Sequence, residues 1–90
     1  MTDEERKRLN KEIEQTLLKM FGTPILNLQQ LAKALNYSST AAIRQAIMRK
    51  TFPIAHFKLH GRRGHFVLVT DVAAYLASQA IEDKGGGKKK

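Results

Sequence analysis

Helix-breaking residues cut this chain of 90 residues into short segments and restrict it to small elements. Gly22 and Pro24 end an N-terminal segment, Pro53 ends a central one, and Gly61 and Gly64 bracket a turn. Glycine readily adopts the left-handed backbone that ends a helix, and proline cannot continue one. Because a chain of this length forms one small domain, the segments are expected to share a single core.

The first segment predicts an amphipathic helix over residues 3–21. Thr2 and Glu5 have the spacing of a capping box, and apolar residues follow at helical intervals: Leu9, Ile13, Leu17, Met20 and Phe21. Two roles are open for this helix within residues 1–22. Its apolar side either packs on the small core of the domain or forms a dimer interface.

Two shorter helices are expected next, after an extended stretch at residues 23–26. Asn27 can cap the second helix, with Gln30 three residues later, and its buried stripe is Leu28, Leu31, Ala32 and Leu35. Asn36 tolerates the left-handed conformation, so the connection is tight. The third helix is predicted over about residues 39–50, with Ser38 or Ser39 as its cap and Ala42, Ile43, Ala46 and Ile47 buried.

A β-hairpin is predicted after Phe52-Pro53. Residues 55–60 alternate strictly between apolar and polar side chains, and an apolar run at residues 65–69 follows the glycine turn. With residues 61–64 as the loop, His60 faces His65, Leu59 faces Phe66, and Phe57 faces Leu68. This register gathers four apolar side chains on the face that meets the core: Phe57, Leu59, Phe66 and Leu68.

Val67 and Val69 fall on the opposite face of that hairpin. They require either cover from the N-terminal helix or a different register. Thr70 is expected to cap a last helix, and residues 82–90, which contain no apolar residue, are expected to form a flexible basic tail. The predicted fold is therefore mainly α-helical, with a small β-hairpin and an extra N-terminal helix.

The middle of the chain carries charges of one sign only: no Asp or Glu occurs between Gln15 and Thr70. This stretch instead contains Lys19, Lys33, Arg44, Arg49, Lys50, Lys58, Arg62 and Arg63. The whole chain has a net charge of +8 and a pI of about 10.1. Surfaces normally mix both signs of charge, so a centre with one sign indicates a polyanionic partner. Nucleic acid is the first candidate, because Lys and Arg neutralise phosphates.

Several other classes of protein are disfavoured. The chain has no cysteine, which excludes disulfides and thiol catalysis. It has no apolar run of the ~20 residues that a membrane span needs and no apolar signal-peptide core, so a cytoplasmic, nucleoid- or plasmid-associated protein is expected. The centre of the chain contains no carboxylate, and no Ser lies beside a His, so the groups that an enzyme would need for acid–base or nucleophilic catalysis are missing there and no enzyme is expected. No cofactor and no metal are expected, because His56, His60 and His65 lack further ligands.

The order of these elements resembles a known family. The segment from Leu28 to Ser38, then Phe52-Pro53, Gly61-Arg62-Arg63 and finally the segment from Thr70 to Leu76 are similar to MerR-like winged helix-turn-helix domains. Among proteins with such domains, these segments resemble the small excisionase and AlpA-type proteins of phages and plasmids. The resemblance covers residues 25–78. It implies that residues 23–81 are a winged helix-turn-helix DNA-binding domain.

Helix-turn-helix proteins insert their second helix into the major groove. The candidate DNA-binding residues on that helix are Ser39, Thr40, Ala41, Arg44, Gln45 and Arg49. On the hairpin they are Lys58, His60, Arg62, Arg63 and His65, with both guanidinium groups expected to project at the tip as a wing. Arg can read guanine and Gln can read adenine, whereas the wing suits phosphates or a narrow minor groove.

The expected function is sequence-specific binding of double-stranded DNA without an effector ligand. Excision, conjugative transfer and transcription control all fit, and a homodimer or tandem multimer on DNA would increase the small footprint of one module. The alternatives are a protein-interaction adaptor that uses its basic face on an acidic partner, and an RNA-binding module. The RNA alternative is disfavoured because Phe52, Phe57 and Phe66 fall into core positions rather than forming a stacking platform.

Overall fold

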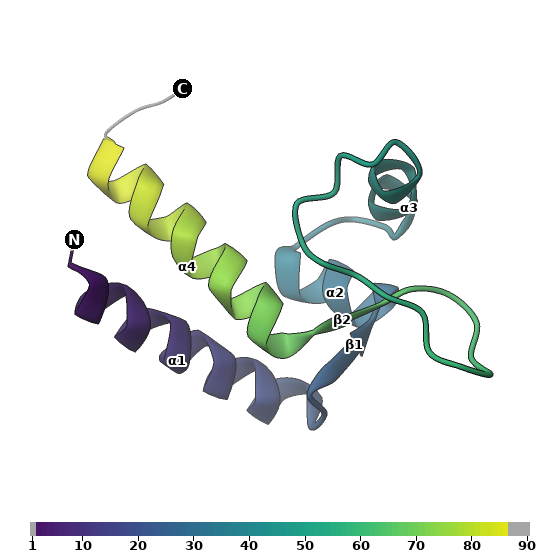
Figure 1. Cartoon of the computed structure of the whole chain (residues 1–90), viewed down its shortest axis with the longest axis horizontal. Helices are drawn as coiled ribbons and strands as arrows, with labels where there is room; N and C mark the ends of the chain where they lie inside the picture. The colour runs from purple at the N-terminus through teal and green to yellow at the C-terminus, as the bar shows by residue number, and fades with distance from the viewer. Residues whose placement is uncertain (1, 87–90) are drawn as a thin grey trace.

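The computed structural model describes the backbone of residues 2–86 and the side chains of residues 2–81. These residues form a mostly helical domain with four helices and a two-stranded antiparallel sheet (Figure 1). In chain order the elements are α1 (Asp3–Phe21), β1 (Ile25–Asn27), α2 (Leu28–Leu35), α3 (Ala41–Met48), β2 (Phe66–Leu68) and α4 (Val69–Gly86). None of these helices is both long enough and apolar enough to cross a membrane.

The caps that the sequence predicts for α1 are present. The Glu5 amide donates to the Thr2 hydroxyl oxygen at 3.1 Å, and the Thr2 amide donates to the Glu5 carboxylate at 2.9 Å. Gly22 ends the helix in the left-handed conformation with a φ of 71°. These local bonds satisfy backbone groups that a helix end leaves without partners, so the predicted bounds of α1 are confirmed.

The start of α2 repeats this arrangement. The Gln30 amide donates to the side-chain oxygen of Asn27 at 2.8 Å, and the Asn27 amide donates to the side-chain oxygen of Gln30 at 3.0 Å. Asn36 ends α2 with a φ of 65°, as the tight connection required. The predicted second helix and both of its boundary residues are therefore confirmed.

Helix α1 packs along α4, and Figure 1 shows the two helices side by side and antiparallel. Leu17 is buried, and Ile13 and Phe21 pack half-buried against the core. The core contains side chains from every helix and both strands, including Leu26, Leu31, Ile43, Val67 and Val72. Of the two roles expected for α1, packing on the domain is therefore present in the single chain.

The sheet differs from the predicted hairpin. Strand β2 pairs with β1, which precedes α2, so Leu26 lies opposite Val67 and Ile25 lies opposite Leu68. Residues 55–60 form no regular strand. They contribute one isolated bridge, in which Phe57 faces Phe66 rather than Leu68. The predicted register is thus wrong, because β2 takes its main partner from a distant segment of the chain.

The burial along β2 matches the predicted core face only in part, since Phe66 is buried as expected but Leu68 is not. Val67 and Val69 are buried, whereas Leu68 is 39% exposed. Leu26 lies opposite Val67, and both side chains are fully buried, so the pairing with β1 decides which face of β2 meets the core. Phe66 is buried on the other face of the sheet, beside Phe57.

The last two helices differ from the prediction at their ends. Helix α3 is shorter than residues 39–50, and its inward side consists of buried Ile43 and Ile47 with half-buried Ala46, whereas Ala42 is exposed. Helix α4 begins at Val69, whose amide still donates to the Pro24 carbonyl oxygen at 2.8 Å. It continues through residues 82–86, which were expected to belong to the tail, and residues 87–90 lie outside the described part.

Candidate nucleic-acid interface

The turn after α2 determines where α3 lies. Asn36 adopts the left-handed conformation, and the Tyr37 amide donates to the Ala32 carbonyl oxygen at 2.8 Å, which closes the helix end. Four residues then lead into α3. Ile43 and Ile47 fix one side of α3 in the core, so the opposite side of this short helix faces away from the domain.

The outward side of α3 carries five exposed residues: Ala41, Ala42, Arg44, Gln45 and Met48. Arg44 and Gln45 lie one turn after the small residues that begin the helix. Alanine at these positions leaves room for a partner to approach the backbone closely. This side therefore presents one cation, one amide and apolar groups, with no acidic residue in the helix.

The two predicted contact residues before α3 have different surroundings. Ser39 is exposed, and its hydroxyl oxygen accepts a hydrogen bond from the Ala41 amide at 3.4 Å. Thr40 is the N-cap residue and is half-buried, and its side chain makes no capping hydrogen bond. The helix thus starts two residues later than predicted, and Ser39 belongs to the turn rather than to α3.

Two basic residues lie at the end of α3, and only the first was predicted to bind DNA. Arg49 caps the helix and is exposed. Lys50 is also exposed and has a φ of 61°, the left-handed region that favours glycine. The Lys50 amide donates to the Ile47 carbonyl oxygen at 3.0 Å, and the Thr51 amide donates to that of Ala46 at 2.9 Å. This bonding pattern stabilises the helix end and fixes the backbone of Lys50.

Residues 58–65 form the loop that was predicted as the tip of the hairpin. The bridge at its base has two hydrogen bonds between Phe57 and Phe66, of 2.9 and 2.8 Å. Within the loop, the Arg62 amide donates to the Leu59 carbonyl oxygen at 3.0 Å. Gly61 and Gly64 have φ values of 75° and 84°, so glycine is suited to both turns.

The two arginines of this loop are not equivalent. The guanidinium group of Arg62 lies over the ring of Phe66, and Arg62 also lines a small pocket with Leu59 and Ile25 on the outer side of the sheet. Arg63 is exposed and has no such contact among the described residues. Arg62 is exposed as well, but its guanidinium group is directed onto the Phe66 ring instead of projecting freely, because a cation is attracted to the face of an aromatic ring.

The other predicted residues of the loop also separate into two groups. Lys58 and His60 are exposed. His65 is half-buried, and its ring meets that of His56 edge-on at a centroid distance of 5.2 Å. Burial lowers the pKa of His65, and the charges of His56 and Lys58 lower this pKa further. The lowered pKa makes His65 a poor partner for phosphate at neutral pH, whereas Lys58 and Arg63 are charged and exposed.

The histidines do not meet at one point. His56 and His65 contact each other, and no cluster of three His, Asp or Glu side chains suited to a metal ion occurs among the residues that the structure describes. The Nδ1 atom of His65 is buried without a hydrogen-bond partner in this part of the chain. The His65 ring is part of a group of aromatic side chains at the base of the loop, in which His56 contacts both His65 and Phe52.

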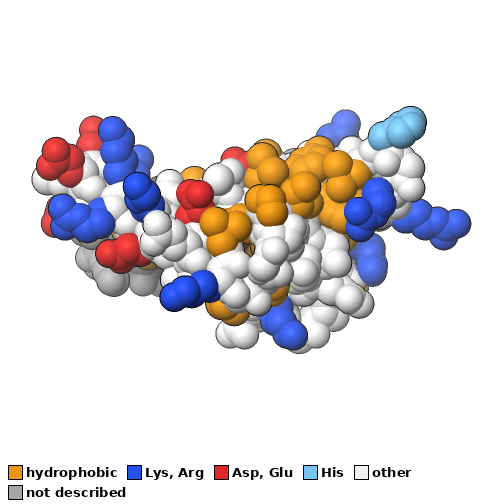
Figure 2. Space-filling model, turned by 90° about the horizontal axis from the view of Figure 1, so that it is seen from below, with side chains coloured by type: hydrophobic (Ala, Val, Ile, Leu, Met, Phe, Trp, Pro, Cys, Tyr) orange, Lys and Arg blue, Asp and Glu red, His pale blue; other side chains and the backbone are white. Residues whose placement is uncertain are grey.

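Acidic side chains gather toward one end of the molecule, whereas basic side chains occur at both ends. On the face in Figure 2, red carboxylates lie among Lys and Arg side chains toward the end where α1 begins, and the other end shows Lys, Arg and His side chains without carboxylates. Figure 1 shows that α3 and the loop of residues 58–65 both lie at the end away from the chain termini. The structure thus brings the two predicted groups of basic residues to the same end of the domain.

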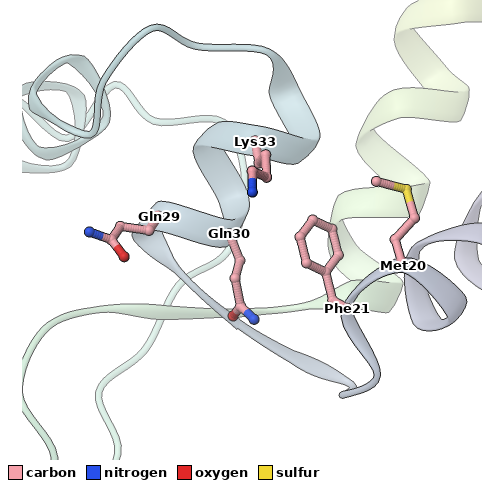
Figure 3. Close-up of a pocket in the computed structure, with 5 residues that line it drawn as sticks. All are labelled: Met20, Phe21, Gln29, Gln30 and Lys33. Carbon is pink, nitrogen blue, oxygen red and sulfur yellow. The ribbon is translucent and has the colours of Figure 1, made fainter.

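A pocket between the end of α1 and α2 offers little chemistry. Its lining consists of Met20, Phe21, Gln29, Gln30 and Lys33, which Figure 3 shows. The side-chain oxygen of Gln30 already accepts the hydrogen bond from the Asn27 amide. The remaining polar groups are the Gln29 side-chain amide, the Gln30 side-chain amide nitrogen and the Lys33 ammonium, and this lining contains no pair of nucleophile and base.

Three exposed residues lie next to the predicted contact residues but were not counted among them: Tyr37, Met48 and Lys50. Tyr37 is exposed directly after α2, at the start of the turn. Helical periodicity places Met48 on the same side of α3 as Arg44, whereas nothing in the sequence marks Lys50 as left-handed. No protein-family model, curated protein or solved structure matches the chain.

Proposed function

We propose that this protein binds double-stranded DNA in a sequence-specific way, as an accessory or regulatory protein of a phage, plasmid or other mobile element. The carrying observation is the exposed side of α3. It presents Arg44 and Gln45 in a stretch of chain that has no acidic residue from Gln15 to Thr70. Arg and Gln are the side chains best suited to bidentate reading of guanine and adenine in the major groove.

The topology supports a winged helix-turn-helix. Helices α2 and α3 are joined by a short turn, and the loop of residues 58–65 follows them and returns to the sheet at Phe66. In space β2 lies between β1 and the bridging residue Phe57, which holds the loop beside the sheet. With α3 in the major groove, this loop would extend along the duplex as the wing.

The wing would add affinity rather than base recognition. Lys58 and Arg63 are exposed and carry no partner that would compete with a phosphate among the described residues. Arg49 and Lys50 lie at the end of α3, where they would meet the backbone at the edge of the groove. Contacts of this kind fix the register of a protein on DNA without reading its sequence.

A second candidate function is that of a protein-interaction adaptor. The outer face of the sheet carries an apolar pair: Ile25 and Leu68 lie opposite each other on it, and Leu68 is 39% exposed. Figure 2 shows hydrophobic side chains gathered next to the basic end of the molecule. Apolar groups beside positive charge would suit an acidic, amphipathic protein segment.

Selection from a random duplex pool tests the proposal. The protein is expected to enrich one DNA sequence, and to bind that duplex more tightly than random duplex, RNA of the same sequence or polyglutamate at equal salt. The symmetry of the enriched sequence reports whether one copy binds or two. Equal affinity for all duplexes, or a preference for polyglutamate, would favour the adaptor.

Arg44→Ala then tests the placement of α3. We expect this variant to lose about 1–3 kcal/mol of binding free energy on the enriched duplex and to lose its preference at one base pair. Lys11→Ala removes an exposed positive charge from α1 and serves as the control that changes neither. If Arg44→Ala weakens binding to enriched and random duplexes equally, Arg44 contacts phosphate and another part of the chain reads the bases.

A further inference from the structure

Met48 is the most exposed large hydrophobic side chain that the structure describes, at 81%. It lies in the last turn of α3, on the outward side that also carries Arg44 and Gln45. Residues three and four apart on a helix are neighbours, so Met48 lies directly beyond these two side chains. The surface that we propose to enter DNA therefore ends in an apolar group.

The length of α3 keeps Met48 within reach of the bases. Eight residues span about 12 Å of helix axis, and the major groove is about 12 Å wide. A helix this short can lie in the groove over its whole length, even if it enters at an angle. Its last turn would then lie over a base pair one or two steps from the purine that Arg44 or Gln45 reads, because neighbouring turns are ~5–6 Å apart.

The chemistry of Met48 restricts what it can recognise there. A thioether carries no charge and accepts only weak hydrogen bonds, so it gains nothing from the donors and acceptors of the base edges. The apolar feature of the major groove is the C5-methyl group of thymine. Cytosine that is methylated at C5 presents the same group. Methionine is flexible and polarisable, so it can adjust to such a methyl group.

We infer that Met48 is a specificity-determining residue that contacts the methyl group of a C5-methylated pyrimidine, next to the base that Arg44 or Gln45 reads. The inference rests on the proposed function, since it requires α3 to lie in the major groove. It adds recognition of a C5-methyl group, which the charge pattern of the chain does not indicate. The target site is expected to hold a methyl-bearing base at a fixed position.

The test removes the methyl group instead of the base. Deoxyuridine replaces each thymine of the enriched duplex in turn, and affinity is measured for the wild type and for Met48→Ala. At one position the wild type is expected to lose about fourfold in affinity, the effect of exposing one methyl-sized apolar group. Met48→Ala is expected to bind the original duplex about fourfold less tightly and to be insensitive to deoxyuridine at that position.

Two variants serve as controls. Met20→Ala removes a methionine that is 60% exposed on α1 and is expected to retain both the affinity and the response to deoxyuridine. Met48→Leu keeps an apolar side chain and is expected to retain the response. Because residue 48 is exposed, equal melting temperatures of Met48→Ala and the wild type will show that the fold is unchanged.

A further arm identifies the source of the methyl group. Cytosine or 5-methylcytosine replaces the thymine at the sensitive position. Equal gains from thymine and 5-methylcytosine mean that the methyl group alone is read, whereas a gain from thymine only means that its carbonyl is read as well. Either result requires Met48 for the methyl effect.

Failure of the inference and failure of the proposed function give different results. A wild type that enriches a duplex but loses as much affinity with deoxyuridine as Met48→Ala does would overturn only the role of Met48. A wild type that enriches no duplex would refute the proposed function, and the inference would fall with it.

Discussion

The guanidinium carbon of Arg62 lies 5.1 Å from the centroid of the Phe66 ring, over its face. Phe66 is only 5% exposed and forms the bridge with Phe57 at the base of the loop. Arg62 thus covers an aromatic ring that would otherwise face water at the edge of the sheet. This contact joins the loop of residues 58–65 to the sheet. It gives Arg62 a structural role, whereas the neighbouring Arg63 stays available for binding.

The variants Arg62→Ala and Arg63→Ala should separate stability from binding. Arg62→Ala is expected to lower the free energy of unfolding by roughly 0.5–1 kcal/mol, the usual worth of an exposed cation–π contact. Arg63→Ala is expected to leave it within about 0.5 kcal/mol and to reduce the salt slope of log affinity for duplex DNA by about 0.9. Urea titration and binding at several salt concentrations measure both quantities. If both variants change both quantities equally, the two arginines share one role.

The helices were predictable because the signals that bound them are local. Thr2 with Glu5 and Asn27 with Gln30 make their hydrogen bonds within three residues, so the sequence pattern alone indicates α1 and α2. The outward side of α3 also follows from helical periodicity, once Ile43 and Ile47 are taken as core residues.

The sheet was not predictable in the same way, because its partners are distant in sequence. Strand β1 has only three residues, whereas the longer alternating pattern of residues 55–60 made that segment the predicted partner of β2. Only the packing of Leu26 against Val67 decides between the two. The contact of Arg62 with Phe66 depends on the same tertiary arrangement. The left-handed backbone of Lys50 is a property of one residue that no sequence pattern marks.

Helix α1 is expected to be essential for the fold. Leu17 is 5% exposed and lies in the core, so Leu17→Ala should lower the free energy of unfolding by about 2–5 kcal/mol. Leu18→Ala, one residue along but 36% exposed, should cost much less and is the matched control. Chemical denaturation measures the difference. A Leu17→Ala variant as stable as Leu18→Ala would mean that α1 is an appendage of the domain.

His65 should make stability depend on pH. Its pKa is lowered in the folded protein from the ordinary value of 6.5, first by burial and then by the charges of His56 and Lys58. The unfolded chain therefore binds more protons than the folded one as the pH falls through this range. The stability present above about pH 6.5 is lost progressively as the pH falls toward the lower pKa of the folded state.

Urea midpoints between pH 8 and pH 5 measure this loss. His65→Gln is expected to flatten the pH dependence, whereas His60→Gln, which changes an exposed residue of the same loop, is expected to leave it as in the wild type. An identical slope in the wild type and in His65→Gln would show that His65 does not contribute to the pH dependence.

Lys50 should combine a cost in stability with a gain in binding. Its φ of 61° is a conformation that costs an L-residue about 1–2 kcal/mol, and glycine usually occupies such positions after helices. We expect Lys50→Gly to be more stable than Lys50→Ala by about 1 kcal/mol, since both variants lack the charge and only alanine retains the strain. Both variants are expected to reduce the salt slope of DNA binding by about 0.9, because the same phosphate contact is lost.

Two measurements separate the backbone strain at residue 50 from the charge of its side chain. Melting curves of the two variants report the backbone strain, and binding at several salt concentrations reports the charge. Lys50→Arg keeps the charge and the strain and should resemble the wild type in both. If Lys50→Gly gains stability without any loss of binding, the lysine has no part in contacting DNA, and the end of α3 points away from the phosphate backbone.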